Sequence, residues 1–427
     1  MKKRTAGSRW LRCAGVCVGI GLSHAARADI AGGEEIALLA LLAFAERNAP
    51  EVRLAERRRA LGDAAQAGAA PMLGGNPTVE VGLGPRMTGR GPSDYDVLLS
   101  VTQPIEVAGE RGLRRTAAAR QGDRLHAEAA ATRWSVTRAI AQTYRAAQAA
   151  SARVGHAERR VGFAREVLSI AQKRAAAGDG TAIDVRVAEA DLAQAQLGRV
   201  LASRELWSAR VRLCELSGWP VDRPPLPTPI GGLIAPTPSL PVLLAQVGAS
   251  HPAVRARRAL EEEAHARVVL ADRQAWPVPS LGVSFTREGS AGSPANYVVL
   301  GTLALSLPAF QRNAGARAEA RAGEAIAAAE RDATLVGLRA RVAAAQGELA
   351  LAAERLHLVG QASGALEDGL RLVRRAFEAG ELSLFELGVA RERLLGLENA
   401  AISARADYDA AQAALEDALG SSGGGAR

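Results

Sequence analysis

Cysteine is scarce in this sequence, with three residues in 427. Two of them, Cys13 and Cys17, fall in an N-terminal segment that we expect to be removed, which leaves Cys214 alone. A single cysteine cannot form an intrachain disulfide, so the mature chain is not a disulfide-stabilised scaffold. The surrounding stretch "ARVRLCELSG" favours a buried, apolar setting for Cys214 over a reactive thiol.

Motifs that bind metals, cofactors or phosphate are also lacking. The sequence contains no CxxC and no HExxH, and "GLGPRMTGRG" and "GERG" lack the Gly-Lys-Ser/Thr ending of a phosphate loop. No Ser/His/Asp arrangement stands out. We therefore expect no cofactor, no fixed metal site and no enzymatic activity. The histidines after the N-terminal segment never lie three or four residues apart: His126, His156, His251, His265 and His357.

Long hydrophobic runs are missing as well. After residue 29 the run "IALLALLAFA" is only ten residues long, short of the roughly 18 that a membrane-spanning helix needs. We therefore expect no spanning helix. The mature protein is either soluble outside the cytoplasm or crosses a membrane as a β-barrel.

The N-terminus resembles a secretory signal peptide. "MKKRTAGSRWLR" is a basic region, "CAGVCVGIGLS" a short apolar core, and Ala26 and Ala28 fit a small-residue cleavage site. We expect cleavage after Ala28. A membrane anchor needs a longer apolar run, and lipidation at Cys17 is disfavoured by Val16 and Ala14 in the preceding positions.

The formal net charge of +8 comes mostly from this segment. Residues 1–28 contain six Lys and Arg and no acid, and the remainder has 47 basic against 45 acidic residues. A mature chain so close to neutrality has no large field to attract phosphates, and no basic stripe is interleaved with aromatic residues. We expect no nucleic-acid partner.

What the chain does contain is a repeat with an offset of 202 residues. "APEVR" (49–53) matches "HPAVR" (251–255), and "AAAGDGTAIDVRVAEA" (175–190) matches "FEAGELSLFELGVARE" (377–392). Short insertions shift the offset to 204 at Pro104 and Pro308 before it returns to 202. Such a recovered register indicates two structural copies. The expected divisions are a signal peptide (1–28), repeat 1 (29–220), a proline-rich linker (221–240), repeat 2 (241–420) and a flexible tail (421–427).

Each copy shows the same order of elements. A helical segment broken at Ala49-Pro50 or His251-Pro252 precedes two strand-like runs, 78–84 and 95–103 in copy one and 280–288 and 296–307 in copy two. The residues between the strands, 85–94 and 289–295, are expected to be flexible polar loops. Very long helices follow at about 113–177 and 315–379, and shorter helices return over about 182–217 and 384–419.

Four strands are too few to close a barrel, because small closed barrels need about eight. An open sheet facing lipid would leave unpaired edges, so subunits must pool their strands. Threefold symmetry gives twelve strands and a matching tube of helices. The expected fold is therefore mainly α, with a long α-helical barrel and four strands per chain in a trimeric, twelve-stranded β-barrel.

These features resemble the TolC-like outer membrane efflux proteins over essentially the whole mature chain. The most specific pieces are the two Gly turns, the helix ending "RLCELSGWP" and the strand-to-helix junctions "VTQPIEVAGERGLRRTAAAR" (101–120) and "LSLPAFQRNAGARAEARA" (305–322). The junction residues are Pro104, Gly109 and Pro308. "NPTVEVG" with "QPIEVAGERG" is most similar to the CzcC-type heavy-metal efflux branch.

The resemblance implies a homotrimer in the outer membrane lipid of a Gram-negative-type cell, with a large periplasmic part. It would be the exit duct of a tripartite system, with a periplasmic adaptor (membrane fusion protein) and an inner membrane pump of resistance-nodulation-division type. The substrate could be heavy-metal cations. A duct for type I protein secretion or for drug efflux is the alternative, and a soluble periplasmic coiled-coil scaffold is a more remote one. Paired hairpins near 77–104 and 279–308 argue against the scaffold.

The resemblance also gives the two Gly turns a role. Gly178 and Gly380 would reverse the chain at a periplasmic tip, and Asp184 and Glu386 would form acidic rings at a gate. Where well-known family members carry a second acid, this sequence has Val187 and Val389. The alternative is that Asp184 and Glu386 only cap the returning helices, since acids are favoured in a first turn. The sequence leaves both roles open.

Overall fold

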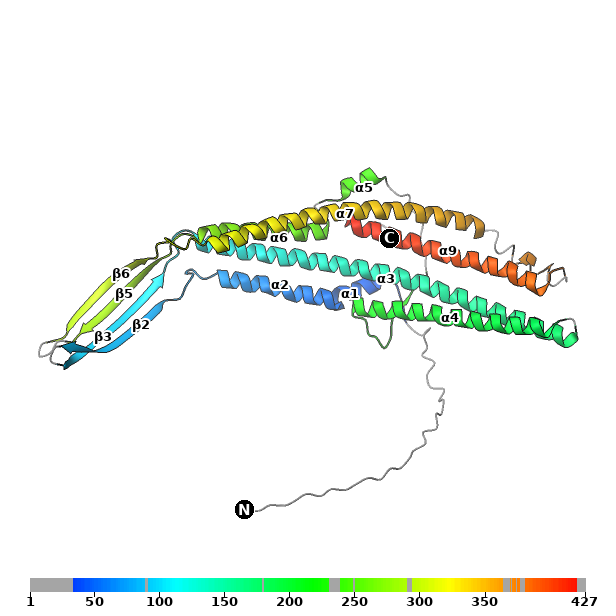
Figure 1. The fold of residues 1–427 in the computed structure, drawn as a ribbon, viewed down its shortest axis with the longest axis horizontal. Helices are drawn as coiled ribbons and strands as arrows, with labels where there is room; N and C mark the ends of the chain where they lie inside the picture. Colours follow the sequence, from blue (N-terminus) through cyan, green and yellow to red (C-terminus); the bar gives the residue numbers. More distant parts are fainter. Residues whose placement is uncertain are drawn as a thin grey trace, which may run out of the picture.

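The chain is elongated, with a β-sheet at one end and helices along the rest of its length (Figure 1). The computed structural model describes residues 34–88, 91–178, 180–229, 239–248, 250–289, 294–363, 369, 371–373, 375–376 and 381–420. The expected signal peptide and C-terminal tail therefore lie outside the described residues. No described helix combines the length and the apolar character needed to cross a membrane.

The longest helix, α3 (Glu110–Ala177), extends from the sheet to the opposite end of the molecule. Its 68 residues correspond to about 100 Å at the α-helical rise. Left-handed glycines lie at both ends, Gly109 (φ 81°) and Gly178 (φ 84°). The predicted helix 113–177 is confirmed and begins three residues earlier.

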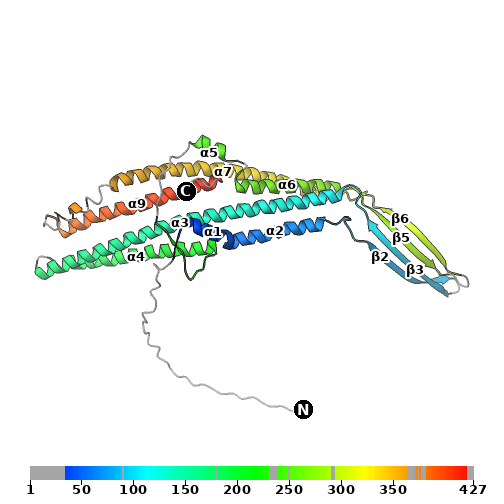
Figure 2. The same cartoon turned by 180° about the vertical axis from the view of Figure 1, so that it is seen from behind.

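Shorter helices flank α3 on both sides, as the two opposite views show (Figures 1 and 2). In the half near the sheet, α2 (Pro50–Ala69) and α6 (Pro252–Arg273) pack against α3. In the other half, α4 (Ala182–Ser217) and α9 (Leu384–Leu419) take these places. Helix α7 (Ala314–Ser363) packs against both α6 and α9. The returning helices have the predicted bounds, and the expected continuation of α7 to residue 379 lies largely outside the described residues.

Four of the described strands form an antiparallel sheet in the order β2-β3-β5-β6. Their bounds are β2 (Thr78–Thr88), β3 (Gly91–Pro104), β5 (Pro279–Glu288) and β6 (Asn296–Leu305). The prediction of a loop at 85–94 was wrong, because strand pairing continues through Gly84↔Asp96 and Arg86↔Asp94. The physical reason is an ion pair between strands, Arg86 Nε to Asp96 Oδ1 at 3.0 Å, which holds the polar residues in register. Strand β5 ends and strand β6 begins on either side of the second predicted loop, 289–295, of which residues 290–293 lie outside the described residues.

The two copies have equivalent hydrophobic cores in the middle of the molecule. The first core joins α1 (Leu38–Asn48) and α2 to α3 and α4, and the second joins α5 (Leu240–Gln246) and α6 to α7 and α9. Buried residues at the same place in the two cores are 202 positions apart, which supports the predicted repeat. The pairs are Leu41 and Leu243, Val52 and Val254, Val136 and Leu338, Ile140 and Val342, and Leu213 and Leu415.

The proline-rich segment 221–240 was expected only to link the copies, but its first half is packed. Strand β4 (Leu226–Pro227) pairs in parallel with β1 (Glu35–Ile36). The fully buried Arg210 of α4 donates hydrogen bonds to the carbonyl oxygens of Pro224 (2.6 Å) and Pro225 (3.2 Å). The linker therefore also fastens the start of the described chain to the helices. Nearby Cys214 is buried as predicted, and burial raises the pKa of its thiol.

Glycines close both returning helices in the left-handed conformation, Gly218 at φ 75° and Gly420 at φ 66°. A Cβ atom at Gly218 would collide with the backbone of Asn48, and one at Gly420 would collide with His251. Both the φ angle and the contact therefore require glycine. Gly198, inside α4, has no atom within 4 Å of such a Cβ position and serves as a control.

We expect Gly218→Ala and Gly420→Ala each to destabilise the protein by at least ~1–3 kcal/mol, the usual cost of a strained backbone conformation. Gly198→Ala should leave stability unchanged or raise it, because alanine is the better helix former. Thermal unfolding of the purified protein, followed by circular dichroism, measures the three shifts. Equal melting temperatures for all three variants would contradict the assigned role of the two terminal glycines.

Candidate functional site at the helical tips and the sheet

At the end of the molecule opposite the sheet, α3 and α4 meet in a tight turn. The N–H of Gly178 donates to Ala175 O, and Thr181 then forms the N-cap of α4. Thr181 Oγ1 accepts the N–H of Asp184 at 3.2 Å, and Asp184 Oδ2 accepts the N–H and the hydroxyl of Thr181 at 2.9 and 2.8 Å. This reciprocal capping box satisfies two backbone donors that a helix start would leave free.

The start of α9 repeats this arrangement 202 residues later. Ser383 Oγ accepts the N–H of Glu386 at 3.2 Å, and Glu386 Oε2 accepts the N–H and the hydroxyl of Ser383, both at 2.8 Å. Sequence reasoning found the acids but missed Thr181 and Ser383. The signal was present, because a Ser or Thr three residues before an acid is typical of a capping box. Gly380 lies outside the described residues.

The capping bonds also hold both acids in the ionised form. The backbone N–H and then the hydroxyl of Thr181 lower the pKa of Asp184, with a smaller contribution from Arg174. The same two groups of Ser383 lower the pKa of Glu386. The sequence left two roles open for Asp184 and Glu386, gating and helix capping, and the structure of the single chain shows the capping role. A gating role stays a proposal.

A groove of about 560 Å³ lies beside these caps, between α3, α4 and α9. Its apolar lining includes Phe163, Val187, Val389 and Phe385, whose side chain is 80% exposed. Asp184, Asp191 and Glu392 supply acidic groups, and Arg160 pairs with Glu392 at 2.6 Å. An apolar groove with a charged rim suits an amphipathic helix.

Ion pairs join the two repeats along α3, and in seven of those between described residues the base belongs to α3. Arg124 pairs with Glu263 of α6, which is only 1% exposed, and Arg138 pairs with Glu416 of α9 at 2.9 Å. His156 and Arg159 both contact Glu398. Burial raises the pKa of Glu398, but these two hydrogen bonds outweigh burial and lower the pKa overall. The other three pairs are Arg120–Glu262, Arg160–Glu392 and the longer Arg145–Glu416, at 4.0 Å.

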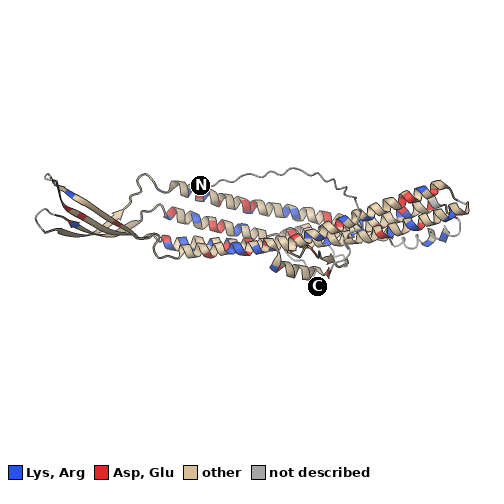
Figure 3. Cartoon of the chain, turned by 90° about the horizontal axis from the view of Figure 1, so that it is seen from below, with Lys and Arg blue, Asp and Glu red and all other residues tan. Residues whose placement is uncertain are grey.

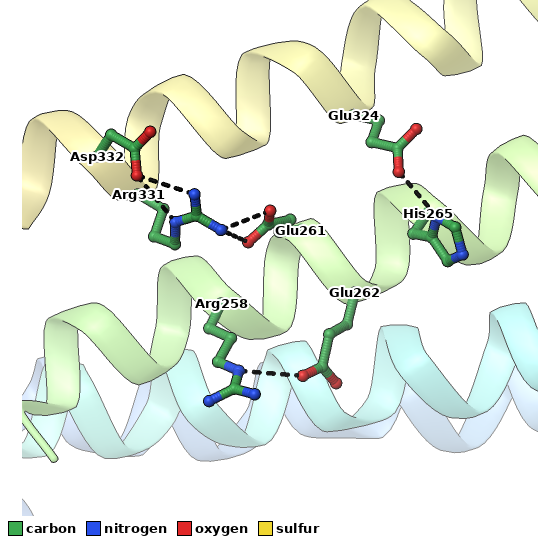
Figure 4. Close-up of polar contacts among 7 residues, drawn as sticks. All are labelled: Arg258, Glu261, Glu262, His265, Glu324, Arg331 and Asp332. Carbon is green, nitrogen blue, oxygen red and sulfur yellow. Dashed lines mark hydrogen bonds and ion pairs between the residues drawn. The ribbon is translucent and has the colours of Figure 1, made fainter. Parts of the chain in front are cut away.

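Helices α6 and α7 are joined in a similar way within the second repeat (Figure 4). Arg331 contacts Glu261 and Asp332, and His265 Nδ1 lies 2.7 Å from Glu324 Oε1. Over the part of the chain that the structure describes, no group of three or more His, Cys, Asp or Glu side chains could hold a metal ion. Basic and acidic residues are interspersed along the helices (Figure 3).

The predicted junction residues lie between the sheet and the helices. Pro104 ends β3, and the left-handed Gly109 precedes α3. Nearby, Arg114 pairs with Glu106 and donates to Pro71 O at 3.1 Å, which ties the start of α3 to the chain before β2. In the second copy Pro308 follows β6, and Arg317 pairs with Asp272 at 2.6 Å.

The sheet has one apolar face and one mostly polar face. Residues paired across strands share a face of the sheet. One row on the apolar face consists of Val81, Leu99, Phe285 and Val299. The neighbouring row, on the other face, consists of Glu80, Ser100, Ser284 and Leu300. Exposed apolar side chains extend over the first face on all four strands: Val79, Val81, Leu83, Leu99, Val101, Leu281, Val283, Phe285, Tyr297, Val299, Leu303 and Leu305.

An open sheet of this kind, continued by a long layer of repeated helices, defines the class of outer membrane efflux channels. The family model "Outer membrane efflux protein" matches the chain twice, over residues 42–219 and 243–421. The chain belongs to this family. It is accordingly a transport protein and not an enzyme, and each match covers one of the two repeats.

The chain is also similar to individual proteins of known name or structure. The chain is 30% identical over 303 residues to the nickel-cobalt-cadmium resistance protein NccC of Alcaligenes xylosoxydans, covering 70% of this chain and 66% of that protein. It is 30% identical over 213 residues to the cobalt-zinc-cadmium resistance protein CzcC of Cupriavidus metallidurans, covering 50% of each. These matches therefore span between half and two thirds of the relatives' length. The crystal structure of the outer membrane protein VceC of Vibrio cholerae superimposes with a TM-score of 0.70 at 19% identity, covering 90% of this chain and 96% of VceC.

We expect Asp184→Ala and Glu386→Ala to increase amide hydrogen exchange in the first turns of α4 and α9, because each removes one half of a capping box. Asp191→Ala, in the same groove but outside the box, is the control. Folding lowers the pKa of both acids, so their contribution is complete above the ordinary carboxyl pKa of about 4 and is lost as the pH falls through the lower folded values. The difference from wild type should therefore shrink as the pH is lowered below about 4. A difference that persists unchanged there would contradict capping by the carboxylates.

Proposed function

We propose that three copies of this chain form the outer membrane exit duct of a tripartite efflux system, which passes its substrate from the periplasm to the exterior. The observation that carries the proposal is the open sheet at the end of the helical layer. Within the described residues β2 and β6 each pair on one side only. Unpaired backbone groups are not tolerated in lipid, so other copies must complete the sheet.

The dimensions and faces of the sheet support a place in the membrane. Strands β5 and β6 have ten residues each and β2 has eleven, which fits the roughly 9–11 residues of a transmembrane strand. The apolar face suits contact with lipid, and the mostly polar face suits a water-filled interior. Three copies supply twelve strands, enough for an open lumen.

The helical layer needs the same closure. Helix α4 lies at one edge of the layer and exposes Leu197, Val200 and Leu201, which are 66%, 56% and 58% accessible. Helix α7 lies at the opposite edge and exposes Val336 and Leu351, which are 67% and 64% accessible. Contact between α7 of one copy and α4 of the next would bury both apolar stripes and close the helices into a tube beneath the barrel.

Partners are proposed from the far end of the helices. The groove beside the tip caps presents Phe163, Val187, Phe385 and Val389 with acids at its rim. It fits an amphipathic helical hairpin, the form that a periplasmic adaptor would present. The adaptor would connect the duct to an inner membrane pump of resistance-nodulation-division type, and a cleaved signal peptide at residues 1–28 would direct export.

Heavy-metal cations are the proposed substrate class. The support is that the relatives NccC and CzcC are named for resistance to nickel, cobalt, zinc and cadmium. A resident metal site is not required, because a duct need not bind tightly what it passes. Drug efflux or protein secretion is the alternative use of the same architecture.

The assembly is tested by the mass of the detergent-extracted protein, measured by light scattering. We expect three chains per particle and no folded monomer, because one chain leaves its sheet open. Deletion of 78–103 or of 280–307 should abolish membrane insertion, while a helical fragment remains soluble. A folded monomer with the full β content, or insertion of either deletion variant, would count against the duct.

The substrate is tested by metal tolerance in a host that lacks the outer membrane component of its own metal-exporting tripartite system. The full-length chain should restore growth on nickel, cobalt or cadmium, and the variant lacking 78–103 should not. Restored tolerance to drugs without any gain on metals would favour the drug-efflux alternative.

A further inference from the structure

The polar face of the sheet carries one acid that has no basic partner. Glu80 lies near the helical end of β2, and its one hydrogen bond among the described residues comes from Ser100 Oγ at 3.4 Å. No described basic side chain lies within ion-pair distance of its carboxylate. The other acids of this face differ, because Asp96 and Glu288 share Arg86 at 3.0 and 3.5 Å.

The strand register places no other charged side chain in the same row as Glu80. Its row continues through Ser100 of β3 and Ser284 of β5, whose side chains are short. Leu300 of β6 completes the row and carries no charge. The Glu80 side chain is exposed, so its carboxylate is accessible to solvent.

We propose that Glu80 is the residue that sets the cation preference of the membrane-embedded part of the duct. The assignment rests on the proposed trimer, in which the polar face lines the lumen. Three copies then place three carboxylates at one height with no base among them. A ring of like charges in a water-filled passage surrounded by low-dielectric walls concentrates cations and repels anions. Divalent metal cations gain more from such a ring than monovalent ions, because the interaction scales with charge.

The tip acids are less suited to this role in the described chain. The carboxylates of Asp184 and Glu386 each accept two hydrogen bonds within their capping boxes. The acids near the far end of the sheet are neutralised in part by Arg86, and Asp94 lies 3.6 Å from Arg287. Glu80 is therefore the acid of the polar face whose charge is least compensated.

The test is ion selectivity of the purified full-length protein in planar lipid bilayers, from the reversal potential under a potassium chloride gradient. Wild type should prefer potassium over chloride. Glu80→Gln keeps the size of the side chain and removes three charges per trimer, so the permeability ratio should fall at least twofold. Glu288→Gln removes the same charge from an acid that is paired with Arg86, and its effect should be smaller.

A second variant keeps the test decisive if Glu80→Gln inserts poorly. Ser284→Lys leaves Glu80 in place and adds a base to the same row, so it should lower the ratio or reverse the preference. An unchanged ratio in both variants at normal conductance, or a larger effect of Glu288→Gln than of Glu80→Gln, would overturn the assignment of Glu80. Wild-type protein that forms no channel would instead contradict the duct itself, and the assignment with it.

Discussion

The open edges of the sheet are the constraint on which the rest of the structure depends. Strands β2 and β6 each offer one row of backbone donors and acceptors that the described chain does not pair. In water such an edge invites association, and in lipid it is untenable. The exposed apolar stripes of α4 and α7 impose the same requirement on the helices. In the proposed duct one chain is a segment of a closed structure, and its repeat supplies two similar units to each segment.

Stability is distributed unevenly along the helices. Both large apolar cores lie in the middle of the molecule, where the short helices meet α3 and α7. Nearer the tips, among the described residues, a smaller buried cluster consists of Val161, Ala164 and Ala195, and ion pairs such as Arg160–Glu392 also join the repeats. Exposed ion pairs contribute little net stability, typically about 0–1 kcal/mol each. The proposed partner groove lies in this part of the molecule, between α3, α4 and α9.

Much of this architecture could be predicted from the sequence, because its signals are local. Gly178 and Gly218 mark helix ends, Ala49-Pro50 marks a helix break, and the 202-residue offset predicted equivalent core positions such as Leu41 and Leu243. Predictions failed where contacts between distant residues decide the conformation. The polar residues 85–88 and 91–94 form strands because Arg86 pairs across to Asp96, and the first half of the proline-rich segment is packed because Arg210 donates to its carbonyl groups. The groove lined by Phe163 and Phe385 joins residues more than 200 positions apart, so no local pattern could reveal it.

Cross-linking between the two edge strands tests the central claim most directly. The expected mature chain has one native cysteine, the buried Cys214, so introduced pairs can be followed cleanly. One cysteine would replace Val81 on β2, and a second would be moved residue by residue along β6 from Asn296 to Leu305. Oxidation in isolated membranes should give covalent dimers and trimers for the positions in register, and none for the single-cysteine variants. Cross-links only within monomers, or none at any position, would show that the sheet is not completed by other copies.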